Sequence, residues 1–524
     1  MSTEMKWGDM LPSLKRSIKV TTGLLRGSMY LGKKVLSSPQ NEQRIDDSIP
    51  IMQRLKPCGI VFGRQGKTYI TKPETMDGHI LVVGGVGSGK SSGIAIPTLR
   101  SWGHNVFAID IKGELYEKTK SHRMNIKVFN PLNNNSYGYD PYFCLYTSGN
   151  PAQEARAIAQ AIIPLPPDIK DPFWIESAQN IFTASILHYN TQGLSFLETV
   201  QQIQSLSPRE LIMEICDGEA VYFVGSMIDM DDKVLSSIVA EISKNIVHFI
   251  TDKNLISALS RNNNIVPDDL EYGYDIYIQI PEHLLNQWKN LLTLIVNQFL
   301  TRFEQRIELN PRPILFLLDE FPRLGKVSAM LDGLATLRSK KITICLIIQS
   351  LAQLDLIYGV NERKVIADTC AYKSILSATD AETQEYFSRL VGTYDKEVTQ
   401  HGTQSSPYLG LPQGQSTGTY EQEKRIIKPE EFATLQDIVL LTPYGNLRIE
   451  KNPYYAEVID NKIHEEKNIK KRIKSIMKIK PKESRELYLR LFRTKWYVEN
   501  RNLDPVEREK QRNQLNAEFP LLRL

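Results

Sequence analysis

Short apolar runs alternate with amphipathic stretches along most of the chain from residue 59 onward. Runs of about four to seven apolar residues between turn-forming segments are typical of buried strands. Because helical stretches separate most of these runs, we predict an α/β fold with a mainly parallel sheet. The expected strands lie at residues 59–62, 80–83, 106–109, 126–129, 276–280, 314–318, 342–348, 371–376 and 438–441.

A long helical section interrupts the strand pattern. Between about residues 142 and 264, apolar positions recur at helical spacing, as in 152–163 and 175–189. Strand patterns resume after this section, with one helix expected over 284–307. We therefore predict a sheet domain in two parts, 56–141 and 265–458, with an inserted all-α domain at 142–264, an N-terminal amphipathic segment at 1–55 and a basic helical tail at 459–524.

Three smaller features refine this picture. The segment 402–418 is rich in Gly, Ser, Gln and Pro and predicts a surface loop. The segment 14–36 has apolar residues at helical spacing, which suits either packing on a protein body or lying on a membrane. Asp171 and Pro172 predict the start of a helix, and we expect the following Phe173-Trp174 pair in the core rather than at a substrate.

Composition places the chain among globular proteins of a reducing compartment. A length of 524 residues suits two or three domains, and the five cysteines form no CxxC pair that would suggest zinc. Without a run of about 20 apolar residues or a signal-peptide pattern, we expect a cytoplasmic protein with no transmembrane segment, peripheral at most to the inner face of the cell membrane. Between Asn461 and Leu524, 18 Lys and Arg outnumber 9 Asp and Glu, so positive charge is concentrated in the tail.

The expected strand at 80–83 leads directly into a glycine-rich loop with the spacing GxxxxGK[ST]. Successive glycines let backbone N–H groups surround phosphate oxygens, and a following helix adds its positive end. Lys90 offers a charge to the outer phosphates, and the Ser91 hydroxyl offers a ligand to Mg²⁺. The loop therefore predicts a nucleotide-binding site made of Gly84, Gly85, Val86, Gly87, Ser88, Gly89, Lys90, Ser91 and Ser92.

A carboxylate pair ends the expected strand at 314–318. Asp319 would hold the water shell of Mg²⁺, and Glu320 would orient and deprotonate an attacking water. Small-molecule kinases do not need such a glutamate, and the chain has no NKxD motif of the kind that reads guanine in GTPases. We therefore expect an ATPase with ATP and Mg²⁺ as cofactors.

Two polar residues flank the expected strand at 342–348. Gln349 follows this strand, where a polar side chain can contact the γ-phosphate and sense its hydrolysis. Arg338 precedes it, and from spacing alone a surface salt bridge suits Arg338 better than an arginine finger that reaches a neighbouring subunit.

Together these motifs resemble the coupling-protein ATPases of conjugative type IV secretion systems, the TraG/TraD family. The likeness runs from about residue 59 to 455 and rests on ordered motifs rather than on the loop alone. These motifs are Gly84 to Ser91, Asp110 to Leu115, Asp171 to Trp174, Leu318 to Phe321 with Leu324-Gly325, Leu334 to Arg338 leading to Gln349-Ser350, Asp380 to Thr383 with Ser388 and Gly392, and Pro453 to Tyr455.

The resemblance implies a RecA-like P-loop ATPase domain that carries the all-α insertion and assembles as a homo-hexameric ring. It implies that the protein recruits relaxase-bound single-stranded DNA and translocates it to the secretion channel, with DNA, the relaxase and the channel or a membrane docking protein as partners. It makes Arg338 a trans-acting arginine finger and places Asp110 near the nucleotide, with helix capping as the alternative for Asp110. Family members usually begin with two membrane-spanning helices, a pair that this sequence does not show.

Two other functions stay open at the level of sequence. Another DNA-pumping ATPase would share the loop, the carboxylate pair and the ring, although the insertion at 142–264 favours conjugation. A nucleotide-gated adaptor would recruit protein substrates without acting as a motor, and the intact Lys90, Asp319 and Glu320 speak against it. The basic tail suits phosphate contacts with base stacking on aromatics such as Phe492 and Trp496, or a solvated pair of amphipathic helices.

Overall fold

The computed structural model describes residues 52–166, 169–307, 311–405, 412–456 and 504–520, together with isolated positions elsewhere in the tail. The helix expected over 14–36 lies outside the described residues. Within the described chain, Ser388–Lys428 belongs to one compact unit, and the remainder forms a second, larger unit.

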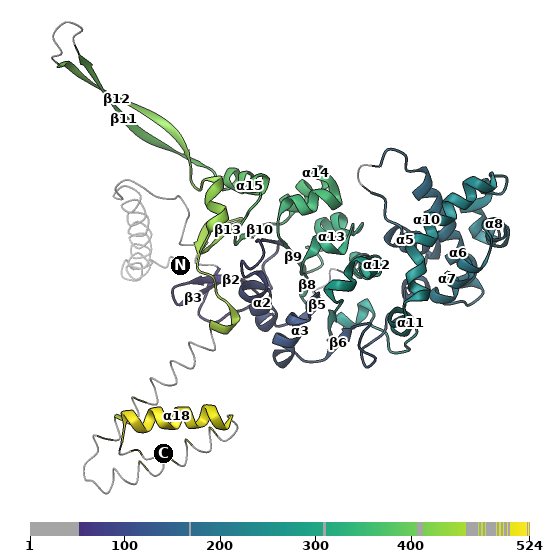
Figure 1. The fold of residues 1–524 in the computed structure, drawn as a ribbon, viewed down its shortest axis with the longest axis horizontal. Helices are drawn as coiled ribbons and strands as arrows, with labels where there is room; N and C mark the ends of the chain where they lie inside the picture. Colours follow the sequence, from purple (N-terminus) through teal and green to yellow (C-terminus); the bar gives the residue numbers. More distant parts are fainter. Residues whose placement is uncertain are drawn as a thin grey trace, which may run out of the picture. The chain divides into compact units, whose positions relative to one another are not determined.

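A nine-stranded sheet forms the centre of the larger unit (Figure 1). Its order is β14-β13-β10-β4-β9-β8-β5-β7-β6, in which every pair from β10 to β6 is parallel and the β13 pairs are antiparallel. The prediction of an α/β fold with a mainly parallel sheet is therefore confirmed. The strands are β4 (Ile80–Val83), β5 (Asn105–Ile109), β6 (Ile126–Phe129), β7 (Asp275–Ile278), β8 (Ile314–Leu318), β9 (Ile342–Ile348), β10 (Tyr372–Ile375), β13 (Ile438–Thr442) and β14 (Gly445–Ile449).

The first expected strand belongs to a different sheet. β2 (Ile60–Gln65) pairs antiparallel with β3 (Thr68–Lys72), which also pairs with the short β1 (Gln53–Arg54). The prediction that residues 59–62 join the parallel sheet is wrong. Only a turn at Gly66, with a φ of 59°, separates β2 from β3, and so short a connection joins antiparallel strands but not parallel ones.

Helices cover both faces of the large sheet. On one face, the π-helix Ser91–Ala95, α2 (Ile96–Ser101) and α3 (Glu114–Thr119) contribute to a core with side chains of β4, β5, β8 and β9. On the other face, α12 (Leu285–Glu304) places Phe299 against Phe107 of β5, with ring centroids 4.5 Å apart. Burial on both faces explains why the strands are continuous apolar runs rather than alternating ones. Three further helices follow later strands, namely α13 (Met330–Thr336), α14 (Leu351–Thr369) and α15 (Ala381–Val391).

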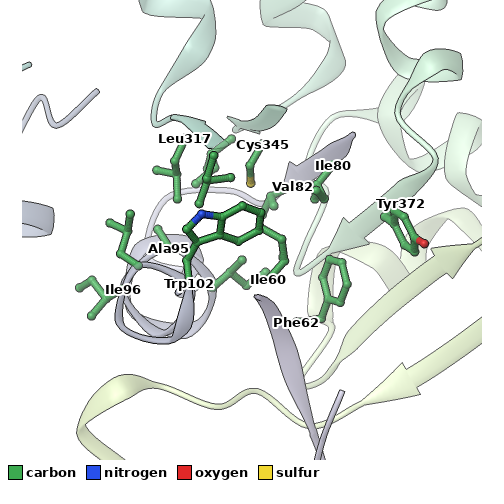
Figure 2. Close-up of a cluster of buried hydrophobic side chains, with 14 of the residues drawn as sticks. Ile60, Phe62, Ile80, Val82, Ala95, Ile96, Trp102, Leu317, Cys345 and Tyr372 are labelled. Atoms are coloured by element: carbon green, nitrogen blue, oxygen red, sulfur yellow. The ribbon is translucent and has the colours of Figure 1, made fainter. Parts of the chain in front are cut away.

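Trp102 lies at the centre of the core between α2 and the sheet (Figure 2). Only 2% of its surface is exposed, so truncation leaves a cavity that neighbours fill only in part. We expect Trp102→Ala to lower the free energy of unfolding by roughly 3–5 kcal/mol, measured by denaturant titration. The matched control is Tyr222→Ala, because Tyr222 is 87% exposed and should change stability by less than about 0.5 kcal/mol. A similar small change in Trp102→Ala would contradict the assigned packing.

The section between β6 and β7 is helical over its described residues, apart from isolated bridges at its ends. Serines start two of its helices with capping boxes, in which Ser195 and Ser207 exchange hydrogen bonds with the glutamates three residues later. The division into domains at 142 and 264 itself stays a prediction. The helices are α4 (Phe143–Thr147), α5 (Pro151–Ile162), α6 (Phe173–Thr191), α7 (Phe196–Ser205), α8 (Pro208–Ile215), α9 (Val221–Val224), α10 (Asp232–Thr251) and α11 (Lys253–Leu259).

The chain enters and leaves this helical section at one point. Gly138 forms an isolated bridge with Asn264, and the Ile265 N–H donates to the Gly138 carbonyl at 2.9 Å. A Cβ atom on Gly138 would lie 2.5 Å from Asn264 Oδ1 and 2.6 Å from Arg261 Cβ. The close approach of the two crossing segments therefore requires glycine here.

α10 is the one described helix that is long and apolar enough to cross a membrane by length and composition. A third of its most apolar window is buried, and its buried side chains, such as Leu235, Ile242 and Phe249, recur at helical spacing. This stripe is what a helix packed in a bundle also shows.

The first turn of α6 differs from expectation. Asp171 Oδ1 accepts the Phe173 N–H at 3.2 Å, so Asp171 pairs with a backbone donor in the first turn, as predicted. Phe173 and Trp174 are 43% and 40% exposed, however, and the prediction that they lie in the core is wrong. The buried positions of α6 begin only at Ser177, one turn later, so this first turn stays at the surface.

The smaller unit contains a long β-hairpin. β11 (Thr393–Ser405) and β12 (Pro412–Arg425) pair antiparallel from Thr393 opposite Arg425 to Ser405 opposite Pro412. The prediction of a surface loop over 402–418 is therefore wrong for the described residues 402–405 and 412–418, which form paired strands. A two-stranded ribbon is held by backbone hydrogen bonds and needs no apolar alternation, so a polar composition did not reveal it.

The described part of the tail contains α18 (Pro505–Glu518). An apolar cluster in the tail includes Phe492 and Trp496, which are 8% and 3% exposed. Their burial favours the interpretation of packed amphipathic helices over one of stacking platforms for bases.

Candidate functional site

The carboxyl ends of four neighbouring strands bring most predicted site residues to one edge of the sheet. The glycine-rich loop follows β4, Gln349 follows β9, the Asp319-Glu320 pair follows β8, and Asp110 follows β5. Ligand sites of open parallel sheets lie at this edge. The strand order, which sequence alone does not reveal, thus creates the site.

Backbone conformation and lack of space explain why glycines occupy three positions of the loop. Gly87 and Gly89 have φ of 74° and 96°, which disfavours residues with a side chain. A Cβ atom on Gly84 would lie 2.4 Å from Ser88 Oγ. Backbone donors fix the loop between two strands, because the Gly84 N–H donates to the Ile348 carbonyl at 3.1 Å.

Lys90 lies inside the loop. The side chain is buried, and its Nζ donates to the Gly84 carbonyl at 2.6 Å and to the Gly85 carbonyl at 3.2 Å. Burial lowers the pKa of Lys90, while Glu320 and Asp319 act in the opposite direction. The ammonium group thus stands between the loop and the carboxylate pair, where phosphate oxygens would replace the two carbonyls as its partners.

Ser91 opens the π-helix Ser91–Ala95, whose Ile96 N–H donates to the Ser91 carbonyl. Single turns of π-helix are rare and recur at functional sites. The hydroxyls of Ser91 and Ser92 therefore sit at the start of a helix, where the backbone N–H groups and the helix dipole favour anions.

Asp319 and Glu320 are both buried, at 5% and 6% exposure. Burial, reinforced by the neighbouring Glu320 carboxylate, raises the pKa of Asp319 to about 7, although Lys90 acts in the opposite direction. Two buried carboxylates with one buried lysine form a site that favours added positive charge. A divalent cation meets that need.

The described residues contain no group of three or more His, Cys, Asp or Glu that would hold a metal by itself. Mg²⁺ commonly takes one or two protein ligands and completes its shell with substrate phosphates and water. The chemistry of Asp319 and the Ser91 hydroxyl beside a phosphate loop fits Mg²⁺ bound together with a nucleotide.

Glu320 has a left-handed backbone, with φ 51° and ψ 42°. This conformation costs a non-glycine residue about 1–3 kcal/mol and concentrates at functional sites. It directs the side chain to the end of β9, where Gln349 Nε2 donates to Glu320 Oε2 at 2.9 Å. The two residues that we predict to handle the attacking water and the γ-phosphate are thus direct neighbours.

Asp110 is held by its own chain. Its Oδ1 accepts the Leu115 N–H at 3.2 Å, and its Oδ2 accepts the Tyr116 N–H at 2.9 Å. Gln279 Nε2 also donates to Oδ2, at 3.4 Å. The carboxylate therefore caps α3, as in the alternative considered for it. It still contributes to the site electrostatically, because its charge helps to raise the pKa of Asp319.

Arg338 is the predicted site residue that the fold does not bring to this edge. It is exposed and lies between α13 and the start of β9, at the amino ends of the strands. Its charge acts on His79, the residue just before β4, which also lies at the amino ends of the strands. The pKa of His79 is lowered to about 4, mainly by burial and by Lys72, and Arg338 makes a smaller contribution. Arg338 therefore lies at the opposite edge of the sheet from the phosphate loop of its own chain, and a role as a finger requires a second copy.

Residues after β10 also belong to this edge. Sequence reasoning did not assign them to the site, although Asp380 was part of one family-like motif. Ser377 Oγ accepts the Gly85 N–H at 2.9 Å, and Thr379 and Asp380 line a cleft with Gly85 and Gln349. The available signal was a polar run directly after the expected strand at 371–376. Its relevance depends on β10 lying beside β4, which the sequence did not show.

Most of the chain matches one known family. A model of the family "Type IV secretory system Conjugative DNA transfer" matches residues 37–484. VirD4 of Rhizobium radiobacter is 27% identical over 424 residues, which cover 77% of this chain and 60% of VirD4. TraG of Escherichia coli is 26% identical over 402 residues, which cover 67% of this chain and 61% of TraG. The chain thus spans about three fifths of the length of these curated relatives.

Solved structures of the plasmid coupling protein TrwB share the fold. TrwB in complex with the non-hydrolysable ATP analogue ADPNP superposes with a TM-score of 0.63 at 17% identity, over 80% of this chain and 96% of TrwB. TrwB in complex with ADP and Mg²⁺ gives a TM-score of 0.60 at 17% identity, over 79% and 94%. The prediction of a RecA-like P-loop fold is confirmed by this likeness. The extent of the family match shows that the chain belongs to the conjugative DNA-transfer family of type IV secretory systems, as its motifs had indicated.

Proposed function

We propose that this chain is an ATP-hydrolysing coupling protein that recruits relaxase-bound single-stranded DNA and translocates it to a type IV secretion channel during conjugation. The observation that carries the proposal is the meeting of Lys90, Asp319, Glu320 and Gln349 beside one phosphate loop. Membership of the conjugative DNA-transfer family supports the biological role. The complexes of TrwB with ADPNP and with ADP and Mg²⁺ support ATP and Mg²⁺ as the ligands.

The residues divide the chemistry among them. Backbone N–H groups of the loop and the Lys90 ammonium bind the β- and γ-phosphates, and Ser91 and Asp319 would hold Mg²⁺. When bound, Mg²⁺ supplies positive charge to the phosphate oxygens. Glu320 orients the attacking water and accepts its proton, and Gln349 contacts the γ-phosphate. The Gln349–Glu320 hydrogen bond then links the state of the phosphate to the position of the base.

Assembly completes the proposed site. In a homo-hexameric ring, Arg338 of one copy would reach the nucleotide of the next and stabilise charge on the transferred phosphoryl group. The partners of the ring are the relaxase, its single-stranded DNA and either the secretion channel or a membrane docking protein. We place the protein on the cytoplasmic side, peripheral to the inner face of the bacterial membrane.

ATP turnover of the purified chain with and without single-stranded DNA tests the motor. We expect turnover that single-stranded DNA increases severalfold. Binding of ATP without turnover under both conditions would instead support a nucleotide-gated adaptor. Another DNA-pumping ATPase would hydrolyse ATP but would not restore plasmid transfer or co-purify with a relaxase, so a transfer assay in cells separates that alternative.

Lys90→Ala should weaken binding of ADP by at least about tenfold, because the variant loses a buried charge–phosphate contact. Isothermal titration calorimetry measures the effect. The matched control is Lys67→Ala in the exposed turn between β2 and β3, which should bind ADP like the wild type. Equal affinities in all three proteins would exclude Lys90 from phosphate binding.

A further inference from the structure

A cleft of ≈ 560 Å³ opens beside the phosphate loop on the β10 side. Ligand sites commonly have volumes of about 300–1,000 Å³. The cleft is continuous with the loop, because Ser377 accepts the Gly85 N–H and Thr379 Cγ2 lies 3.7 Å from the position of a Cβ on Gly85. Its lining consists of Gly85, Val86, Gly87, Ser88, Gln349, Ser350, Gln353, Ser377, Thr379, Asp380, Ala433, Leu435 and Lys451.

Three buried oxygens in this lining have no hydrogen-bond partner among the described residues, namely Asp380 Oδ2, Gln353 Oε1 and Ser88 Oγ. The Ser88 hydroxyl can donate as well as accept, whereas the Asp380 and Gln353 oxygens only accept. Buried polar atoms are rarely left without a partner. A phosphate offers only acceptor oxygens and negative charge, so it can pair with the Ser88 hydroxyl but not with the Asp380 or Gln353 oxygen. The matching ligand must carry hydroxyl or amino donors and must lie next to the phosphates.

Asp380 is fixed in place by its other oxygen. Oδ1 accepts the Thr383 N–H at 2.9 Å and so caps α15. Thr383 in turn ties α15 to α14, because its buried Oγ1 accepts the Leu351 N–H at 2.9 Å. Helix capping thus uses only half of the carboxylate and leaves Oδ2 held rigidly in the cleft wall, as a binding site requires.

We infer that this cleft binds the ribose of the nucleotide and that the Asp380 carboxylate accepts hydrogen bonds from the ribose 2′- and 3′-hydroxyls. The inference rests on the proposed nucleotide-binding function. Ribose is the first part of a nucleotide beyond its phosphates, and its vicinal hydroxyls offer two donors to one acidic group, as acidic residues do for ribose in dinucleotide-binding folds. The site therefore selects ribonucleotides over nucleotides that lack these hydroxyls.

Binding of ADP, 2′,3′-dideoxy-ADP and pyrophosphate by the full chain tests this assignment without hydrolysis. The wild type should bind ADP about tenfold more tightly than dideoxy-ADP, the effect of a hydrogen bond to a charged group. Asp380→Asn keeps the cap on α15 and replaces the acceptor Oδ2 with an NH₂ donor. This variant should bind ADP and dideoxy-ADP about equally, with unchanged affinity for dideoxy-ADP.

The exposed Asp229 lies outside the cleft, and Asp229→Asn serves as a charge-matched control that should keep the wild-type preference. Equal binding of ADP and dideoxy-ADP by the wild type would overturn the ribose site, as would a preference that survives in Asp380→Asn. Failure of the wild type to bind ADP or pyrophosphate would overturn the proposed function, and the ribose site with it.

Discussion

Glu320→Gln should bind ATP as tightly as the wild type and hydrolyse it at least about 100-fold more slowly, because the amide cannot accept a proton from the attacking water. The substitution preserves shape. Gln349 Nε2 now donates to Glu320 Oε2, and a glutamine at this position still offers an acceptor oxygen. The energetic cost of the left-handed backbone at position 320 is also unchanged, since glutamate and glutamine both carry a Cβ.

Single-turnover hydrolysis and equilibrium binding measure these two quantities separately. Glu219→Gln, on an exposed position of the helical section, is the matched control and should hydrolyse ATP like the wild type. Turnover in Glu320→Gln above about a tenth of the wild-type rate would remove Glu320 from the role of general base.

Arg338→Ala should lower turnover by at least about 1,000-fold while leaving ATP affinity unchanged, the range attributed to arginine fingers. The reason lies in the sheet. Arg338 precedes β9 at the amino ends of the strands, whereas the phosphate loop follows β4 at their carboxyl ends. An arginine finger at position 338 would therefore act on the phosphate loop of a different copy.

This arrangement predicts complementation between two inactive variants. In a mixed ring, a copy with Arg338→Ala keeps an intact Glu320, and a neighbour with Glu320→Gln keeps an intact Arg338. Mixing should restore a measurable part of the wild-type turnover, whereas each variant alone stays inactive. Lys340→Ala, in the same turn before β9, is the control for nonspecific loss of a positive charge. Normal turnover of Arg338→Ala would contradict the finger.

The residues of the candidate site that could be predicted are those whose type and spacing form a local sequence motif. Lys90, Ser91, Asp319 and Glu320 could be predicted because a loop after one strand and carboxylates after another leave local patterns. Gln349 required the further expectation that its strand lies beside them, which the order β4-β9-β8 provides. Their assigned roles still await the measurements above.

Features that depend on neighbours in space were out of reach. Ser377 joins the site only because β10 lies beside β4, and no local pattern reports that pairing. Asp110 was expected near the nucleotide, with helix capping as the alternative, and only its partners in α3 identified the cap. The β11–β12 hairpin has a polar, loop-like composition, since backbone pairing and not apolar burial defines it.

The bridged pair at Gly138 separates the length of the helical section from the geometry of the sheet. Because the chain leaves the sheet region and returns to it through one bridged pair, the ends of the helical section are fixed whatever lies between them. Closing such a loop costs little additional entropy as its length changes. We therefore expect that the helical section can change in length without shifting the register of the strands that carry the candidate nucleotide site.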